Sequence, residues 1–350
     1  MHMADALISP LVGGTMWVST AGVAAYSIKK IQTEMDEKKI PLMGVMGAFI
    51  FASQMINFTI PATGSSGHIG GGLILAILLG PYAGFLTMAS VLTIQALFFA
   101  DGGLLALGSN IFNMGFFSCF IAYPLIYKGL MGKGYSTKRI LFASVLTSII
   151  GLQLGAFGVV LETLFSGKTE LPFGTFVLLM QPIHLAIGAV EGLVTAAIVT
   201  YIWNSRPEII EKASSGQAIG NVSIKKVVVG IVTISVITGG GLSWFASSNP
   251  DGLEWAMTKT AGTAKLEAPD GIHQQLSDLQ TKTALFPDYS FKAPENEVDQ
   301  GAGEVKETWP AVSGGASTSG LVGGGMTLAL AALVGVGISF LKRRKNRTSI

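Results

Sequence analysis

Long apolar runs separated by polar loops constrain this chain more than any other feature. A helix of about 20 apolar residues spans the hydrocarbon core of a bilayer and satisfies its own backbone hydrogen bonds there. Only 13% of the 350 residues are charged, whereas soluble domains carry about 25%. The sequence therefore predicts an all-α polytopic membrane protein. Its predicted helices cover residues 9–28, 41–60, 70–79, 82–99, 107–127, 140–165, 173–202, 227–245 and 321–341.

The loops predict the topology of these helices. Lysine and arginine gather in four segments: residues 29–39, 128–139, 206–226 and 342–347. Cytoplasmic loops carry an excess of basic residues, and nine crossings place all four segments on one side. The count requires two crossings between residues 69 and 100, divided at the Gly80-Pro81 breaker. We therefore expect a multi-pass protein with its N-terminus outside the cell and its C-terminus in the cytoplasm.

A polar linker divides the chain into two parts. Residues 1–205 hold seven predicted helices, and residues 206–226 form a cytoplasmic linker. Residues 227–341 hold two helices that flank a long outer segment, residues 246–319, and residues 342–350 form a basic cytoplasmic tail. The outer segment has 11 Asp or Glu, 5 Lys and no Arg, which suits an outer location. The net charge of the whole chain, only +2, argues against a nucleic-acid partner.

His2 follows the initiator methionine, and this position creates a chelating group. The α-amine of Met1, the main-chain nitrogen of His2 and its imidazole are three consecutive nitrogen donors. Binding through all three closes a five-membered and a six-membered ring around one metal. Flat nitrogen ligation is typical of Ni(II) and Cu(II). The alternative is that His2 is incidental in a frayed terminus, where disorder is common.

His68 is the candidate for a fourth nitrogen ligand. It ends a Gly/Ser-rich loop, residues 61–68, that leads into an unusually short predicted helix. Non-helical backbone at membrane depth lines a cavity or is buried in protein, and short helices often mark a ligand site. The predicted topology places His2 and His68 on the same outer side. We therefore favour both histidines as metal ligands.

Several motifs give the chain a family resemblance. The motifs of the first part are Met1–Pro10, Ser65-Ser66-Gly67-His68, Phe99–Gly103, Asn110–Gly115 and His184–Gly192. With these motifs, residues 1–205 resemble the substrate-binding membrane subunit of nickel/cobalt energy-coupling-factor transporters. Residues 249–255, Asn-Pro-Asp-Gly-Leu-Glu-Trp, are similar to part of the small accessory subunit of these transporters. The second part would thus be that subunit, fused to the first.

The resemblance implies a function and a fold. The chain would be the metal-binding subunit of an ATP-driven importer in a prokaryotic cell membrane, and not itself an enzyme. A six-helix bundle with an extra N-terminal helix would hold Ni2+, or alternatively Co2+, through Met1, His2 and His68. A membrane coupling subunit and two cytoplasmic ATPases would be its partners. The alternative is a stand-alone secondary metal carrier, for which Glu191 is the strong candidate among acidic groups near the midplane.

Polar residues near the expected ligands are further candidates. Asp101 opens a turn on the same side, and a carboxylate there would lower the cost of a dication in a poorly hydrated site. Asn110 and Asn113 lie one turn apart and could hydrogen-bond the site loop, although helix capping also explains Asn110. Ser66 lies in the loop that ends at His68. For His184 and Glu191, which are seven residues apart on one helix face, we favour polar contacts between helices.

Overall fold

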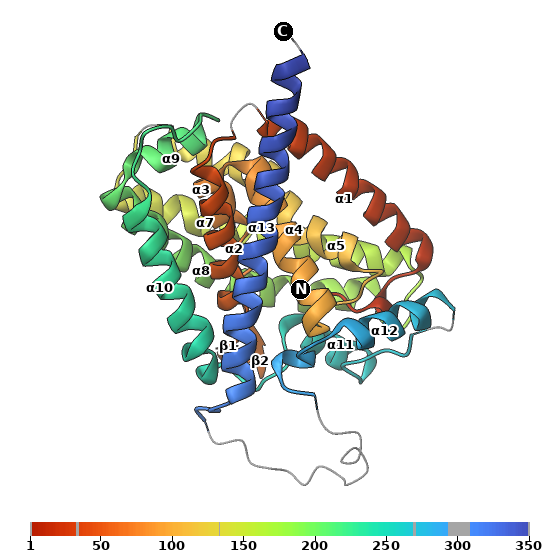
Figure 1. Ribbon diagram of the computed structural model, residues 1–350. Helices are drawn as coiled ribbons and strands as arrows, with labels where there is room; N and C mark the ends of the chain where they lie inside the picture. The colour runs from red at the N-terminus through yellow and green to blue at the C-terminus, as the bar shows by residue number, and fades with distance from the viewer. Residues whose placement is uncertain (1, 33–34, 133, 269–270, 293–308, 349–350) are drawn as a thin grey trace.

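The computed structural model is mainly helical and describes residues 2–32, 35–132, 134–268, 271–292 and 309–348 (Figure 1). Its elements are η1 (Asp5–Leu7), α1 (Pro10–Ile31), α2 (Lys39–Gln54), β1 (Phe58–Ile60), β2 (Ser65–Gly67), α3 (Gly72–Leu79), α4 (Pro81–Phe99), α5 (Leu107–Ile111), the π-helix η2 (Phe112–Tyr127), α6 (Lys128–Met131), α7 (Thr137–Phe165), α8 (Phe173–Ser205), α9 (Pro207–Ser214), α10 (Lys225–Gly240), η3 (Leu242–Phe245), α11 (Gly252–Ala261), α12 (Ile272–Thr283), η4 (Pro287–Tyr289) and α13 (Gly314–Thr348).

Six helical stretches in the described part are long and apolar enough to cross a membrane. They are α1, α4, α7, α8, α13 and the continuous stretch Leu107–Met131, which joins α5, η2 and α6. The other three predicted spans are shorter: α2 and α10 have 16 residues each, and α3 has eight. All eight residues of α3 are buried, so the short helix predicted before Gly80 lies inside the bundle.

Two predicted boundaries were wrong. The helix predicted for residues 41–60 ends at Gln54, and the chain then forms an antiparallel hairpin in which Phe58 pairs with Gly67. The turn accounts for the change, because Pro61 ends the strand and Gly64 has a φ of +74° that suits glycine. The last helix, predicted for residues 321–341, begins at Gly314, and the outer segment before it contains α11, α12 and η4.

Glycines let the helices approach closely. A Cβ atom at Gly192 in α8 would lie 2.3 Å from the Cα atom of Val145 in α7, and one at Gly188 would lie 2.7 Å from the Cα atom of Ile149. Small residues at this spacing allow membrane helices to pack backbone to backbone. The long helix α13 packs on α2, where Gly323 leaves room for the ring of Phe51. The second part of the chain is thus packed against the first.

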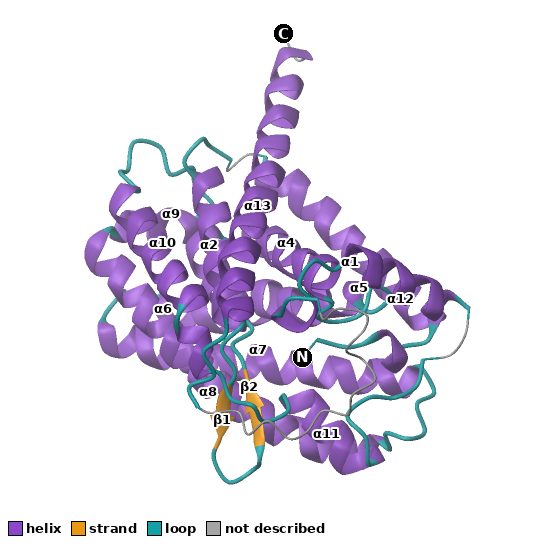
Figure 2. Cartoon of the chain, turned by 60° about the horizontal axis from the view of Figure 1, so that its bottom comes forward, coloured by secondary structure: helices purple, strands orange, loops and turns teal. Residues whose placement is uncertain are grey.

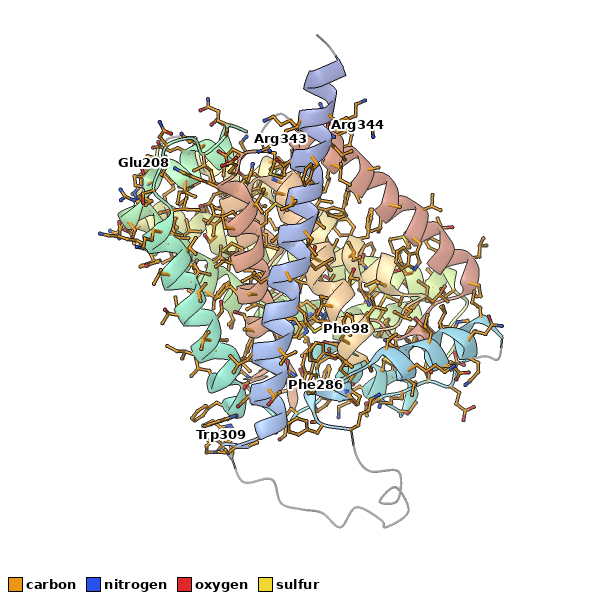
Figure 3. The ribbon with its side chains drawn as sticks, in the orientation of Figure 1. Phe98, Glu208, Phe286, Trp309, Arg343 and Arg344 are labelled. Carbon is orange, nitrogen blue, oxygen red and sulfur yellow. The ribbon has the colours of Figure 1, made fainter. Side chains whose placement is uncertain are left out.

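The basic segments meet at one end of the molecule. The Lys38 ammonium donates to the carbonyl of Val222, Lys128 to that of Ser214, and Lys342 to that of Met35. Figure 3 shows Arg343, Arg344 and Glu208 at this end and Trp309 at the other. The opposite end, which faces the viewer in Figure 2, carries the hairpin and α11. The basic loops therefore share one side, as the sequence predicted.

We expect the variant Gly192→Ala to lose stability by about 1–3 kcal/mol, the usual cost of overpacking. The added methyl group would meet the α7 backbone, which cannot move aside as a flexible side chain would. Thermal unfolding of the protein in detergent measures the loss. Gly22→Ala in α1 is the matched control, because no atom lies within 4 Å of the added methyl group. Equal unfolding temperatures for the two variants would contradict the tight α7–α8 contact.

Candidate metal centre

The N-terminal tail enters the bundle as an extended segment fixed by Asn110. The Met3 N–H donates to Oδ1 of Asn110 at 2.8 Å, and the Asn110 amide donates back to the Met3 carbonyl at 3.2 Å. The Gly103 N–H also donates to this carbonyl. Met3, Leu7 and Ile8 have almost no exposed surface. The tail is therefore buried from Met3 onward. Met1 lies outside the described residues.

The tail is tied down again at Asp5, which begins η1. Its Oδ1 atom accepts the N–H of Ala106 at 3.0 Å, just before α5 starts at Leu107. Beyond η1, Ser9 caps α1 by accepting the Val12 N–H. These contacts fix the chain on both sides of the buried stretch. His2 therefore has a defined position at the centre of the molecule.

His68 is held by its own loop. Its Nδ1 atom lies 3.0 Å from the carbonyl oxygen of Ile69. A carbonyl only accepts, so Nδ1 carries the proton and Nε2 keeps its lone pair for a metal. Two residues on, the Gly70 N–H donates to Oε2 of Glu191 at 2.6 Å, and the Gln54 amide donates to the Gly70 carbonyl at 2.8 Å. Glu191 thus positions the loop that carries His68.

The structure brings His2 and His68 together. Their ring centroids are 5.0 Å apart and the rings are stacked at 18°. Burial lowers the pKa of each imidazole to about 3, so both rings are neutral at physiological pH and able to coordinate a metal. No group of three or more His, Cys, Asp or Glu side chains in the described ranges could hold a metal ion. The ligand set predicted from the sequence also includes the N-terminal amine and the main-chain nitrogen of His2.

Asp101 lies beside the nitrogen that the chelate would use. Only Nδ1 of His2 closes a six-membered ring with the His2 main-chain nitrogen, by bond counting. This Nδ1 atom is 3.2 Å from Oδ1 of Asp101. Burial raises the pKa of this carboxyl group above its usual value. A cation bound at Nδ1 of His2 would therefore lie next to the Asp101 carboxyl group. It would stabilise the ionised form of that group.

A cavity of about 520 Å3 opens at the two histidines, and both parts of the chain line it. The first part contributes the histidines, Asp101 and Gln54. The second contributes side chains from the outer segment that the sequence did not predict at the site: Asp251, His273, Gln280 and Tyr289. Two of these anchor neighbouring loops: the Gln280 amide donates to the Gly102 carbonyl at 2.6 Å, and His273 Nε2 lies 2.9 Å from the Ile8 carbonyl oxygen.

The Pro-Asp-Gly-Leu-Glu sequence docks on the hairpin strand that precedes His68. The Ser66 N–H donates to the Pro250 carbonyl at 2.8 Å, and Asp251 forms a parallel bridge with Ser66. The Ser66 hydroxyl donates to the carbonyl of Asn249 at 2.7 Å. Residues 249–251 thus pair with the free edge of β2 as a short added strand. Gly252 then passes close to α8, where a Cβ atom would lie 2.5 Å from the side chain of Ile183.

The other predicted residues divide clearly. Asn110 meets the tail, but Asn113 donates to Glu162 of α7 at 2.9 Å and takes part in helix packing. Ser66 binds the docked segment and not the histidines. The Nδ1 atom of His184 lies 2.8 Å from the Met180 carbonyl one turn earlier in its own helix.

Asn110→Ala should release the tail. It leaves the Met3 N–H without its partner, and an unsatisfied buried donor costs about 1–3 kcal/mol. Amide hydrogen exchange of residues 3–8 should become faster. Asn113→Ala is the matched control, because it removes the same amide group one turn along the helix, where the partner is Glu162. Equally fast exchange in both variants would show that Asn110 does not hold the tail.

The apolar helices and the paired histidines are those of a metal-transport protein of the membrane, and comparison with known proteins agrees. Residues 2–209 match the family described as the cobalt uptake substrate-specific transmembrane region (CbiM). This is more than half of the chain, and the chain belongs to this family. Residues 225–340 match the PDGLE domain. The predicted resemblance to a fused transporter subunit is therefore confirmed.

Relatives of known name include fused proteins of the same kind. The chain is 39% identical to a putative fused nickel transport protein, NikMN, of Archaeoglobus fulgidus, over 62% of this chain and 70% of that protein. It is 32% identical to the fused nickel transport protein NikMN of Rhodobacter capsulatus, over 60% and 64%. A crystal structure of a truncated transition metal transporter matches with a TM-score of 0.52 and 30% identity, covering 59% of this chain and 99% of that one.

Proposed function

We propose that this protein is the high-affinity Ni2+-binding subunit of an ATP-driven energy-coupling-factor importer. The juxtaposition of His2 and His68 at the buried end of the N-terminal tail carries the proposal. Ni2+ would be chelated by the N-terminal amine, the main-chain nitrogen and imidazole of His2, and the imidazole of His68. Flat nitrogen ligation favours Ni(II) over Co(II), and fused relatives carry nickel transport in their names. Co2+ is the alternative cargo.

The proposed orientation follows from the gathered basic segments. Their end of the molecule would face the cytoplasm, and the cavity and the N-terminus would open to the outside, where metal enters. Residues 1–205 would form the metal-binding unit, and residues 227–341 the accessory unit that lines its outer side. ATP hydrolysis would belong to two separate cytoplasmic ATPases, joined to this chain by a membrane coupling subunit.

The runner-up function is a stand-alone secondary carrier, which would need ion-coupled acidic groups within the membrane. Two buried acids in the spanning helices are already engaged in structural contacts. Glu191 accepts the Gly70 N–H, and Glu162 accepts the Asn113 amide. Their engagement favours the ATP-driven importer.

A Gly-Ser-Gly-Ser extension before Met1 should abolish high-affinity Ni2+ binding, because it removes the free amine from the chelate. The loss should exceed the roughly 10–100-fold that follows from removing a partner of a metal ligand. His68→Ala should have a comparable effect. Equilibrium titration of the purified protein with Ni2+ measures both, and the same extension after Ile350 is the matched control. Wild-type affinity in the N-terminally extended protein would rule out the amine as a ligand.

The ATP-driven importer and the carrier predict different behaviour of the reconstituted protein. In proteoliposomes that hold this chain alone, Ni2+ should bind without accumulating. Accumulation should appear when the coupling subunit and the ATPases are added with internal ATP, and a variant ATPase unable to hydrolyse ATP should abolish it. Accumulation driven by an ion gradient in the absence of those partners would favour the carrier.

A further inference from the structure

Tyr289 of the outer segment reaches the metal centre directly. Its hydroxyl donates a hydrogen bond to Oδ2 of Asp101. The other oxygen of the same carboxylate, Oδ1, lies 3.2 Å from Nδ1 of His2. The two oxygens of Asp101 therefore have different neighbours, and a residue of the accessory part determines how this carboxylate is turned.

The position of Tyr289 is well supported. Its ring stacks on Phe99 at a centroid distance of 5.2 Å and meets Phe51 edge-on at 6.1 Å. The N–H groups of Leu285 and Phe286 both donate to the Phe98 carbonyl, at 2.8 and 3.0 Å. Figure 3 shows Phe98 and Phe286 side by side at the end of α4. These contacts hold the segment before Tyr289 against the turn that contains Asp101.

Asp101 is equally constrained on its own side. Its N–H donates to the Gln95 carbonyl at 3.1 Å, and Ala100 before it has a φ of +56° that closes the turn after α4. The Gly102 carbonyl after it accepts the Gln280 amide. The backbone around Asp101 is thus fixed, and the remaining freedom is rotation of the carboxylate. The Tyr289 hydroxyl, bonded to Oδ2, restricts this rotation from the side opposite His2.

We propose that Tyr289 is a positioning residue that keeps Asp101 beside His2 as a charge partner and prevents it from becoming a ligand of the metal. The inference rests on the proposed Ni2+ site. A carboxylate free to rotate would add an oxygen ligand to a flat nitrogen complex. An oxygen donor suits Mg2+, Ca2+ and Mn2+, whereas imidazole suits Ni2+. Through Tyr289, the accessory part would maintain the nitrogen-only donor set.

The visible absorption spectrum of the Ni2+-loaded, full-length protein tests this directly, because it distinguishes a planar complex from one with more ligands. We expect a planar band for the wild type and a shift to lower energy in Tyr289→Phe, which keeps the ring contacts and removes only the hydroxyl. Adding Asp101→Asn to Tyr289→Phe should restore the planar band. Asp101→Asn alone should leave the band unchanged. Ser290→Ala, which removes the hydroxyl of the exposed neighbouring residue, is the matched control.

Three results would overturn the inference. The first is an unshifted band in Tyr289→Phe, and the second is a shift that persists in the double variant. The third is a shift in Asp101→Asn alone, because this would make Asp101 a ligand in the wild type. Failure of the proposed function gives a different result, since His68→Ala would then keep the wild-type spectrum and affinity. The two failures are therefore distinguishable in one set of samples.

Discussion

The candidate metal centre depends on one physical requirement: an extended chain that enters an apolar bundle must find a partner for each main-chain polar group. Asn110 meets this requirement at Met3, because its side-chain amide accepts and donates much as a neighbouring strand would. Asp5, a residue of the tail, uses its side chain to accept the Ala106 N–H just before α5. With the chain fixed at both residues, His2 has little freedom, and its ring meets that of His68.

The outer segment makes hydrogen bonds to loops of the first part that surround the candidate site. The Pro250 carbonyl binds Ser66 beside His68, His273 meets the Ile8 carbonyl at the end of the tail, and Gln280 binds Gly102 beside Asp101. Helices are held by their own hydrogen bonds and by close packing, whereas loops lack both supports. The outer segment therefore orders the loops that carry the metal centre, while α10 and α13 pack on the bundle.

Hydropathy and basic loops were enough to predict the helical class, the gathering of the basic segments and the short helix α3. The pairing of His2 and His68 was also predictable. A histidine in second position and a Gly/Ser loop before a histidine are both local sequence features, and the predicted topology placed them on the same side of the membrane. The role of Ser66, the hairpin and the contact from Tyr289 to Asp101 were not predictable. The Ser66 and Tyr289 contacts join residues 183 and 188 positions apart, and the hairpin depends on strand pairing after a turn. Hydropathy carries no information on either.

The proposed ligand set would explain why a carboxylate beside the metal needs a restraint. An amine, two imidazoles and one deprotonated main-chain nitrogen would leave a bound dication with a net positive charge in a poorly hydrated cavity, so a nearby anion would be favourable. The same anion, if it were a ligand, would make the site attractive to the hard cations that oxygen donors prefer. A hydrogen bond from the Tyr289 phenol to Oδ2 would resolve this conflict, because it would keep the negative charge close and restrict the rotation of the carboxylate, whose Oδ1 lies beside His2. Because the phenol comes from the fused second part, the proposal would give this part a physical role in selecting the metal.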